Sequence, residues 1–462
     1  MKQSILKSLM LMAMLFTSGT VWSEDFEVGG IYYDDITPIT SSCKTVAVTY
    51  KGHNYFDYDE YSGIVTIPET VTYNDTTYNV TSIGDYAFKD CDSLTSVNIP
   101  NSVIGIGFEA FKNTGWYNKQ PNDILYLDNC CLGYKDSRSR PSSHLSIKTG
   151  TRLIADYAFL YCNGLTSVDI PNSVISIGDF AFANCALTNV DIPNSVISIG
   201  RHAFFECYYL TSVIFGNSVS KVGNSAFGSC DNLKSVHISD LESWVGIDFY
   251  DITANPLYNA MKLYVNSELV SDVRIEKSTE IKRYTFVNCS SLTSVTFANS
   301  VTSIGNRAFA LCTGLKSVII PNSVTSIENL AFYLCTGLTN VSIGNSVASI
   351  GEQAFYGCSS ISSIVSANPV PPTCELRVFT DVNKKTTKLF VPQKSISLYE
   401  TADTWMDFLN ILGEDMSTME ETLADDAEEP AEYYTLQGVK VENPKNGVYV
   451  KKQGSRAIKV LM

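Results

Sequence analysis

A segment of 23 residues repeats along much of this chain. The copy from Leu292 to Gly314 reads LTSVTFANSVTSIGNRAFALCTG, and copies in the same frame begin at Leu315 and Leu338. A chain with such a period forms a row of equivalent units, because each unit is too small to bury its own apolar side chains. The phenylalanine of the repeat marks the series, at positions 88, 111, 159, 182, 204, 227, 286, 309, 332 and 355.

Each unit reads Leu-x-x-Val-x-Ile, a polar turn, Val-x-x-Ile-Gly and then Ala-Phe-x-x-Cys. The first segment is short and β-branched, which predicts a strand. Ala-Phe-x-x-Cys is too short for an independent helix and predicts one helical or 3₁₀ turn. A period in the twenties with leucine at set positions is the signature of a leucine-rich repeat. We therefore predict a leucine-rich repeat solenoid of 23-residue coils with short parallel β-strands.

The polar turn has a recurrent Asn-Ser pair, as in IPNSV at 99–103 and 320–324. Asparagine and serine satisfy backbone groups locally at turns, and a stacked column of asparagine could also bridge coils. A carbohydrate-binding ladder of amides is the functional alternative. We favour the structural interpretation, because turn chemistry alone requires these residue types.

The repeat unit resembles the BspA-like, or treponemal-type, leucine-rich repeat of surface proteins from the Bacteroides and Prevotella group. The similarity covers residues 80–365 by the repeats themselves. This resemblance implies an exported cell-surface or secreted protein that acts as an adhesin or protein-binding scaffold. Its expected partner is an extracellular protein, such as a host matrix protein or a protein of a neighbouring cell.

The N-terminus has the features of a secretory signal peptide, residues 1–23. Lys2 and Lys7 provide the positive region, and an apolar run follows from Leu9 to Phe16. That run is too short to span a bilayer, and no later run reaches the length that a transmembrane helix needs. The sequence thus predicts secretion or a place at the cell surface, associated with the outer membrane, and no transmembrane segment.

Five further regions follow. We expect a β-rich N-terminal cap at 24–79, the solenoid at 80–365 with interruptions at about 115–145 and 239–280, a C-terminal cap at 366–412, an acidic linker at 413–432 and a C-terminal β module at 433–462. The last resembles, in abbreviated form, the sorting domains of type IX secretion substrates. In the C-terminal cap we expect the last coil to be covered by Leu398, Trp405, Phe408 and Ile411.

The two interruptions are the irregular parts of the repeat region. Asp136, Arg138 and Arg140 mark an exposed loop in the first. The second contains Trp244, Phe249 and Tyr258, which could form a recognition patch. We favour the alternative that these aromatic side chains fill the volume that regular coils would occupy.

Thirteen cysteines in an exported chain would ordinarily suggest disulfides. Nine of them, however, lie three residues after a repeat phenylalanine. In-register stacking places such side chains parallel and too far apart to bond, so we predict buried free thiols in this column. The sequence leaves the oxidation of Cys43, Cys130, Cys131 and Cys374 open.

Charge and motifs disfavour several function classes. The net charge is −15, with nine acidic residues and no lysine or arginine at 413–432, which argues against nucleic-acid binding. The run from Asp57 to Tyr61 lacks the glycine and final glutamate of an EF-hand loop, so we expect a solvated, charged hairpin tip rather than a calcium site. The four histidines are scattered, and we expect His202 to face solvent. No catalytic residue, metal site or cofactor is predicted, and the chain is not expected to be an enzyme.

Binding residues are sought among positions that vary between coils. The residue between Val and Ile of the strand points away from the core by alternation, and stacking aligns these positions in a stripe. We predict that it contributes, with flanking Thr and Ser, to a protein-binding surface; a merely solvated sheet face is the alternative. Its members are Asn98, Asp169, Asp191, Ile214, His237, Thr296, Ile319 and Ser342.

Two function classes remain open from the sequence. The first is an adhesin or interaction scaffold for an extracellular protein. The second is a glycan-binding accessory protein or, less favoured, a hydrolase whose site is built from the aromatic interruptions.

Overall fold

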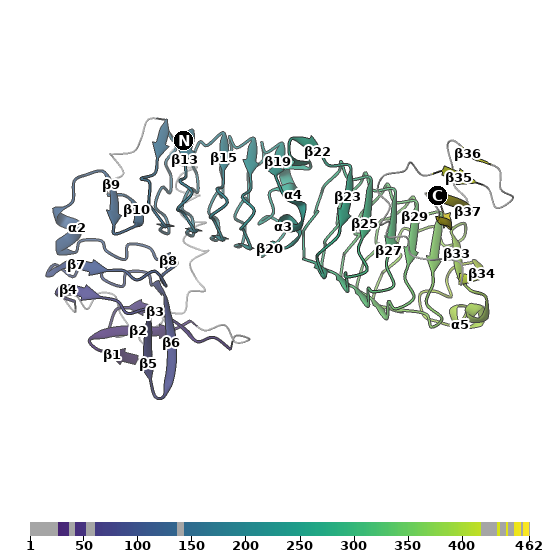
Figure 1. The fold of residues 1–462 in the computed structure, drawn as a ribbon, viewed down its shortest axis with the longest axis horizontal. Coiled ribbons are helices and arrows are strands. Elements are labelled where there is room, and N and C mark those ends of the chain that lie inside the picture. Colours follow the sequence, from purple (N-terminus) through teal and green to yellow (C-terminus); the bar gives the residue numbers. More distant parts are fainter. Residues whose placement is uncertain are drawn as a thin grey trace, which may run out of the picture. The chain divides into compact units, whose positions relative to one another are not determined.

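The computed structural model describes residues 26–36, 42–51, 61–135 and 143–416 and four strand segments between 432 and 461. Figure 1 shows these residues as a coloured ribbon. They divide into two compact units. One comprises residues 1–140, 150–159 and 175–181, and the other 141–149, 160–174 and 182–462. Several predicted features lie outside the described residues: the signal peptide 1–23, residues 57–60 of the run that ends at Tyr61, the loop of Asp136, Arg138 and Arg140, and residues 417–431 of the acidic linker.

The first unit begins with β-hairpins, as the alternating pattern predicts. Strand β6 pairs antiparallel with β5 but parallel with β3 and β8, and this is where the parallel arrangement of the coils starts. The sheet has the order β1-β2-β3-β6-β5, with β8 beside β6. Its strands are β1 (Phe26–Val28), β2 (Ile31–Asp35), β3 (Thr45–Thr49), β5 (Thr70–Tyr73), β6 (Thr76–Ile83) and β8 (Gly105–Ile106).

Tyr61, which we expected in a solvated hairpin tip, is instead buried and covers the N-terminal end of the phenylalanine series. Its ring centroid lies 4.7 Å from that of Phe88, and its hydroxyl donates to the Thr49 carbonyl at 2.7 Å. An uncovered first coil would expose its apolar side chains to water. The hairpins and Tyr61 therefore act as the predicted β-rich cap.

The rest of the first unit contains the start of the solenoid and its first interruption. In the interruption, a helix and the antiparallel hairpin of β9 and β10 replace a regular coil, and β10 continues in parallel to β12 and β14. The elements are β4 (Gly63–Thr66), which pairs with β7 (Leu94–Asn98), helix α2 (Gly115–Lys119), β9 (Ile124–Leu127), β10 (Cys130–Tyr134), β12 (Leu153–Ile154) and β14 (Ser176–Ile177).

The second unit has two stretches of stacked coils, each with two parallel ladders. In the first stretch, one ladder is β15-β17-β19-β21, ended by the short antiparallel β22, and the other is β16-β18-β20. Its strands are β11 (His144–Ser146), β13 (Ser167–Asp169), β15 (Asn189–Asp191), β16 (Ser198–Ile199), β17 (Ser212–Ile214), β18 (Lys221–Val222), β19 (Ser235–Ile238), β20 (Asp248–Phe249), β21 (Leu263–Val265) and β22 (Glu268–Leu269).

The second stretch has the ladders β23-β25-β27-β29-β31-β33-β34 and β24-β26-β28-β30-β32. They comprise β23 (Asp272–Ile275), β24 (Glu280–Ile281), β25 (Ser294–Phe297), β26 (Ser303–Ile304), β27 (Ser317–Ile320), β28 (Ser326–Ile327), β29 (Asn340–Ile343), β30 (Ser349–Ile350), β31 (Ser363–Ser366), β32 (Thr373–Cys374), β33 (Lys388–Pro392) and β34 (Asn410–Glu414). After β33 come the 3₁₀ turn η2 (Gln393–Ser395) and helix α5 (Ile396–Tyr399).

The C-terminal segment forms a small antiparallel sheet, as its alternating sequence predicts. The order is β36-β35-β37-β38. The strands are β35 (Glu432–Tyr434), β36 (Lys440–Val441), β37 (Val448–Gln453) and β38 (Arg456–Leu461).

The repeat phenylalanines form stacked columns in the core. Phe332 lies between Phe309 and Phe355, with ring centroids 5.3 and 5.2 Å away and planes within 4° of parallel. Phe88 and Phe111 stack in the same way in the first unit, at 5.3 Å. Because each ring is buried by the rings of its neighbouring coils, a single coil has no complete core. The predicted solenoid of stacked 23-residue coils is confirmed.

The Ala-Phe turn keeps some of the in-coil bonds of the predicted 3₁₀ turn, as from the Tyr333 N–H to the Leu330 carbonyl at 3.0 Å, but its backbone is not helical. Leu330 and Leu334, before Ala and before Cys, both have φ of +57°. The N–H groups of Leu330, Phe332 and Leu334 donate to the carbonyls of Glu352, Ala354 and Tyr356 in the next coil, at 2.8, 2.8 and 2.7 Å. A helical turn would use such donors within its own coil. Equivalent bonds recur in other coils, as from Phe88 to Ala110, and we call the whole series of these inter-coil bonds the turn ladder.

The cysteine column consists of buried free thiols, as predicted. Several of these thiols donate to the carbonyl of the repeat phenylalanine in the preceding coil. The Cys335 thiol, for example, donates to the Phe309 carbonyl at 3.1 Å. Burial raises the pKa of Cys358 to about 12, so its thiol stays protonated and unreactive. The cysteines that the sequence left open, Cys43, Cys130, Cys131 and Cys374, also lie outside any disulfide.

The second interruption folds into α3 (Leu241–Val245), β20, α4 (Leu257–Ala260) and the β21–β22 hairpin. Trp244 and Phe249 are buried, and the Trp244 indole N–H donates to the Thr285 carbonyl at 3.0 Å. The volume-filling interpretation is therefore confirmed for these two side chains. Tyr258 is half-buried.

The carboxylate of Glu242 joins helix α3 to the loop before β24. It accepts from the backbone N–H groups of Glu276, Lys277 and Ser278, at 2.6, 3.1 and 3.1 Å, and from the Ser278 hydroxyl at 2.6 Å. Burial raises the pKa of Glu242, but these hydrogen bonds outweigh it and hold the pKa below its ordinary value. Glu242 is therefore charged at neutral pH and connects the two ends of the interruption.

The phenylalanine column continues beyond residue 365, where we expected regular coils to end. Phe379 stacks on Phe355 at 5.5 Å and is covered by Trp405 and Phe408, at 5.3 and 5.4 Å. Trp405 and Phe408 are buried, as predicted. The expectation for Leu398 is wrong, since its side chain is 49% exposed on helix α5.

Candidate binding surface

The predicted stripe residues lie on the outer side of the parallel strands. Alternation along each strand points Val and Ile inward and the residue between them outward. In β17, for example, Val213 is fully buried while Ile214 is 46% exposed. All eight predicted residues are exposed or half-buried, namely Asn98, Asp169, Asp191, Ile214, His237, Thr296, Ile319 and Ser342.

Three of these residues align in the first stretch of the second unit. Asp191, Ile214 and His237 are direct register partners on β15, β17 and β19. Tyr264 on β21 continues the row, and its ring stacks on that of His237 at 4.8 Å. We call Asp191, Ile214, His237 and Tyr264 the first stripe.

Three more align in the second stretch. Thr296, Ile319 and Ser342 are register partners on β25, β27 and β29, and Arg274 on β23 precedes them. The next position, Val365, is only 2% exposed, so the accessible row ends at Ser342. We call Arg274, Thr296, Ile319 and Ser342 the second stripe. The β22 hairpin strand separates the two ladders, so they do not form one continuous row.

The remaining two predicted residues have separate settings. Asp169 on β13 lies beside His144 of β11, and its Oδ2 is 3.1 Å from the His144 Nε2. Asn98 belongs to the first unit, where its side-chain amide donates to Thr66 on the paired strand β4 at 2.9 Å. The structure therefore places the eight residues in several groups, of which the two stripes are the largest.

The flanking threonines have a structural role that sequence reasoning missed. Their hydroxyls donate to carbonyls one coil earlier, as from Thr211 to Thr188 at 3.0 Å and from Thr339 to Lys316 at 2.9 Å. A ligand can therefore use them only as acceptors while these bonds persist. The signal was visible in the sequence as threonine recurring after the repeat leucine.

The asparagines of the polar turn also bridge coils. The side-chain oxygen of Asn194 accepts from the backbone N–H of Asn217 at 2.9 Å, and that of Asn322 accepts from Asn345 at 2.6 Å. This confirms the structural interpretation of the Asn-Ser turn. The amide oxygens are used for stacking, so the turn column offers less to a ligand than its exposure suggests.

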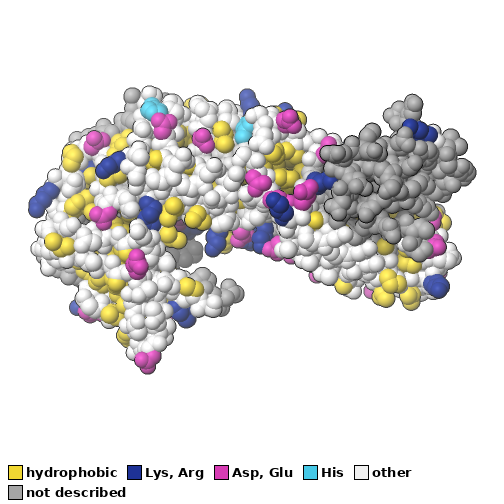
Figure 2. Space-filling view, in the orientation of Figure 1, with side chains coloured by type: hydrophobic (Ala, Val, Ile, Leu, Met, Phe, Trp, Pro, Cys, Tyr) yellow, Lys and Arg dark blue, Asp and Glu magenta, His cyan; other side chains and the backbone are white. Residues whose placement is uncertain are grey.

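The two stripes differ in chemistry. The first combines a carboxylate, an isoleucine and a stacked His–Tyr pair, whereas the second combines an arginine, two hydroxyls and an isoleucine. Ile214 and Ile319, 46% and 57% exposed, lie inside their rows. Figure 2 shows scattered charges of both signs on the face that it displays, without a large single-sign patch. Such a surface suits a mixed apolar and polar protein contact.

Tyr264 and Arg274 are stripe members that sequence reasoning missed. Both belong to the irregular second interruption, where the repeat pattern gives no frame. The segment Asp272–Ile275, which contains Arg274, alternates polar and apolar residues as a strand would, and this was the available signal.

The described part of the chain contains no group of three or more His, Cys, Asp or Glu side chains that could hold a metal ion. Among the same residues, no helix has the length and apolar character needed to cross a membrane. His202, expected to face solvent, is half-buried with its ring 5.0 Å from that of Phe205.

Comparison with known protein families agrees with this architecture. The profile described as "BspA type Leucine rich repeat region (6 copies)" matches residues 49–135, 137–251 and 266–402. These ranges include the first stripe except Tyr264 and all of the second stripe. No curated protein matches the chain.

Several solved structures are similar to this chain. A leucine-rich repeat protein from Bacteroides ovatus is 25% identical over 79% of this chain and 99% of its own, with a TM-score of 0.39. A leucine rich cell surface protein from Faecalibacterium prausnitzii is 23% identical over 74% and 94%, with a TM-score of 0.31. The pneumococcal vaccine antigen PcpA is 19% identical over 84% and 98%, with a TM-score of 0.36.

Proposed function

Since this chain belongs to the BspA-type leucine-rich repeat family, we propose that it is an exported adhesin or protein-binding scaffold. Solenoids of this family are in general non-catalytic scaffolds and are typically found at the cell surface or secreted. The proposed partner is an extracellular protein of a host or of a neighbouring cell. Export would use the signal peptide predicted at residues 1–23, which lies outside the described residues.

One observation carries this proposal: the exposed isoleucines inside two ordered polar rows. A rigid parallel sheet holds Ile214 and Ile319 in place without loss of backbone freedom on binding. Apolar side chains surrounded by polar groups are the usual centre of a protein interface. Each row also offers charge, from Asp191 and Arg274, which can orient a partner.

We expect the substitutions Ile214→Asp and Ile319→Asp to weaken adhesion. A buried charge at the centre of an interface would weaken binding by at least about tenfold, or ~1.4 kcal/mol. Binding of the full chain to purified extracellular-matrix proteins and to whole host cells would be measured by surface plasmon resonance and by adhesion assay. Circular dichroism would verify that both variants fold.

Ile197→Asp is the matched control, because Ile197 is 50% exposed but precedes β16 and belongs to neither stripe. Its binding should equal that of the unsubstituted chain. If the two stripe variants bind as tightly as the control, the stripes are only a solvated sheet face.

A further inference from the structure

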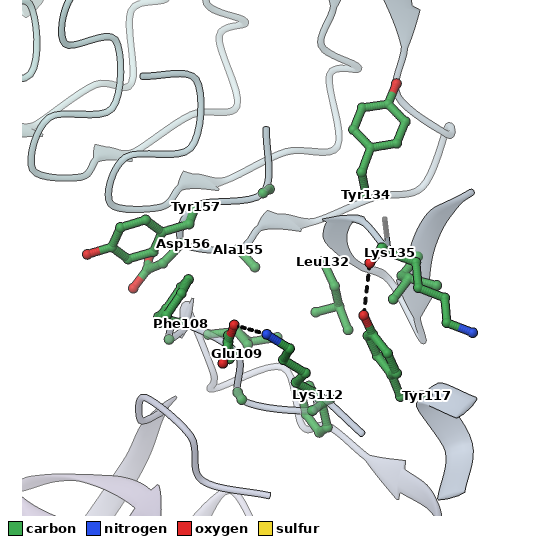
Figure 3. Close-up of a pocket in the computed structure, with 16 residues that line it drawn as sticks. Phe108, Glu109, Lys112, Tyr117, Leu132, Tyr134, Lys135, Ala155, Asp156 and Tyr157 are labelled. Carbon is green, nitrogen blue, oxygen red and sulfur yellow. Dashed lines mark hydrogen bonds and ion pairs between the residues drawn. The ribbon is translucent and has the colours of Figure 1, made fainter. Parts of the chain in front are cut away.

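A cavity of about 210 Å³ lies in the first unit beside the first interruption (Figure 3). Phe108, Glu109 and Lys112 line one side, from the Ala-Phe turn of the coil at 107–112. Asp156 and Tyr157 line the opposite side, from the turn at 155–158. Tyr117 and Tyr134, from α2 and β10, complete the wall, and we call this cavity the turn gap.

The turn gap exists because one turn of the stack is missing. The coil at 115–135 contributes the β9–β10 hairpin instead of an Ala-Phe turn. Consequently the turn ladder is interrupted: the N–H groups of Tyr86 and Phe88 donate forward to Phe108 and Ala110, at 2.9 and 2.8 Å. The corresponding N–H groups of Glu109 and Phe111 have no such acceptor among the described residues.

The turn gap also explains why an aromatic residue stands at position 108. In neighbouring coils a polar side chain follows the repeat glycine, or the alanine that replaces this glycine, and it accepts a hydrogen bond from the next coil. Asp85 Oδ1, for example, accepts from the Phe108 N–H at 2.7 Å. Asp156 Oδ1 accepts from Asp179 in the same way, at 2.7 Å. Beside the gap there is no next turn to reach, and an aromatic ring occupies the slot. That ring lies 4.7 Å from the Tyr157 ring, at 60°.

The charges around the turn gap are balanced. Glu109 pairs with Lys89 at 2.8 Å and with Lys112. Burial raises the pKa of Glu109, but Lys112 and Lys89 outweigh it and hold the pKa below its ordinary value. With Asp156 and Lys135, the lining has two carboxylates and two ammonium groups. An ionic ligand of either sign would meet a like charge, which favours a neutral ligand with many hydroxyls.

The shape of the gap favours a small ring over a peptide. The volume is below the about 300–1,000 Å³ of pockets for drug-sized ligands. The inner end is closed, because the Asp156 N–H donates directly to the Ile106 carbonyl at 2.9 Å. A polypeptide therefore could not pass between the two turns.

We propose that the turn gap binds one ring of a neutral saccharide. Ring hydroxyl oxygens would accept from the Glu109 and Phe111 N–H groups, and hydroxyl protons would be donated to the carboxylates of Glu109 and Asp156. The apolar face of the ring would pack against Phe108 and Tyr157. The turn gap shares no residue with the two stripes, so the saccharide proposal can be tested independently of the proposed protein binding.

The test measures binding of free glucose, galactose, mannose and N-acetylglucosamine to the full chain, by saturation-transfer NMR and calorimetry. Phe108→Asn is the main variant, because Asn224 and Asn306 follow the repeat glycine in regular coils. Leu132→Trp is the second variant and fills the cavity from β10. Tyr209→Ser, an exposed aromatic in the other unit, is the control.

We expect at least one of these sugars to bind, both variants to weaken it by at least about tenfold, and the control to leave it unchanged. Glucuronate should bind more weakly than glucose. The proposal is overturned if no sugar binds, if the variants bind sugar as the control does, or if glucuronate binds more tightly. Displacement of the sugar by short neutral peptides, with tighter binding of the peptide, would also overturn it.

Discussion

Replacing Phe332 by alanine is expected to lower the free energy of unfolding by about 3–5 kcal/mol. Phe332 is fully buried and stacks on both Phe309 and Phe355. Its removal leaves a cavity that two rigid neighbouring rings cannot close, and it weakens the contact of its coil with both neighbours. Urea denaturation followed by circular dichroism and tryptophan fluorescence would measure the loss.

Tyr209→Ala removes an aromatic of similar size that is 64% exposed, and it should change stability by no more than about 0.5 kcal/mol. Phe332→Leu should give an intermediate loss, because leucine fills part of the space. If Phe332→Ala cost no more than the Tyr209 variant, the column would not be a principal source of stability.

Gly133→Ala is expected to destabilise the first unit strongly. Gly133 has φ of +87°, and a Cβ atom there would lie 1.9 Å from the Ala158 carbonyl oxygen. The left-handed backbone contributes about 1–3 kcal/mol and the clash about 1–3 kcal/mol more. The bulge at Gly133 lets Tyr134 donate its N–H to the same carbonyl, at 3.2 Å. Thermal and urea unfolding would measure the effect.

Gly150→Ala separates the two contributions, since Gly150 has φ of +88° but nothing within 4 Å of the added Cβ. It should show the backbone strain alone. Equal losses in the two variants would mean that β10 does not approach the turn at 155–158 as closely as the structure shows.

The repeat pattern was sufficient to predict the stacked architecture and the buried cysteine column, and the alternating pattern before it predicted the β-rich N-terminal cap. The first two follow from residue types at fixed spacing, such as Phe332 and Cys335, which can be buried only against their counterparts in adjacent coils. The end of the column was predicted less well. Phe379 occurs in a coil of divergent sequence, and Leu398 lies on a helix whose buried face is set by Tyr399.

The turn conformation could not be read from the sequence. Left-handed φ is usually signalled by Gly or Asn, but here Leu330 and Leu334 adopt it. The turn ladder with the next coil holds them there, which is a tertiary effect. The turn gap could not be predicted from the sequence either, because it depends on which coil lacks a turn.

The candidate stripe was predictable in its outward direction but not in its extent. Alternation places Ile214 and Ile319 outward. The division into two rows depends on the β21–β22 hairpin, and the end of the second row depends on the burial of Val365. Neither follows from the repeat frame, since both arise where the chain departs from it.

Hydrogen exchange of individual backbone amides, measured on the full chain by mass spectrometry with fragment-level resolution, tests the inter-coil stacking most directly. The amides of Phe309 and Phe332 bond to the next coil at 2.8 Å and should exchange slowly. Those of Glu109 and Phe111, which face the missing turn, should exchange fast. Equally fast exchange at all four amides would contradict a solenoid joined by its turns.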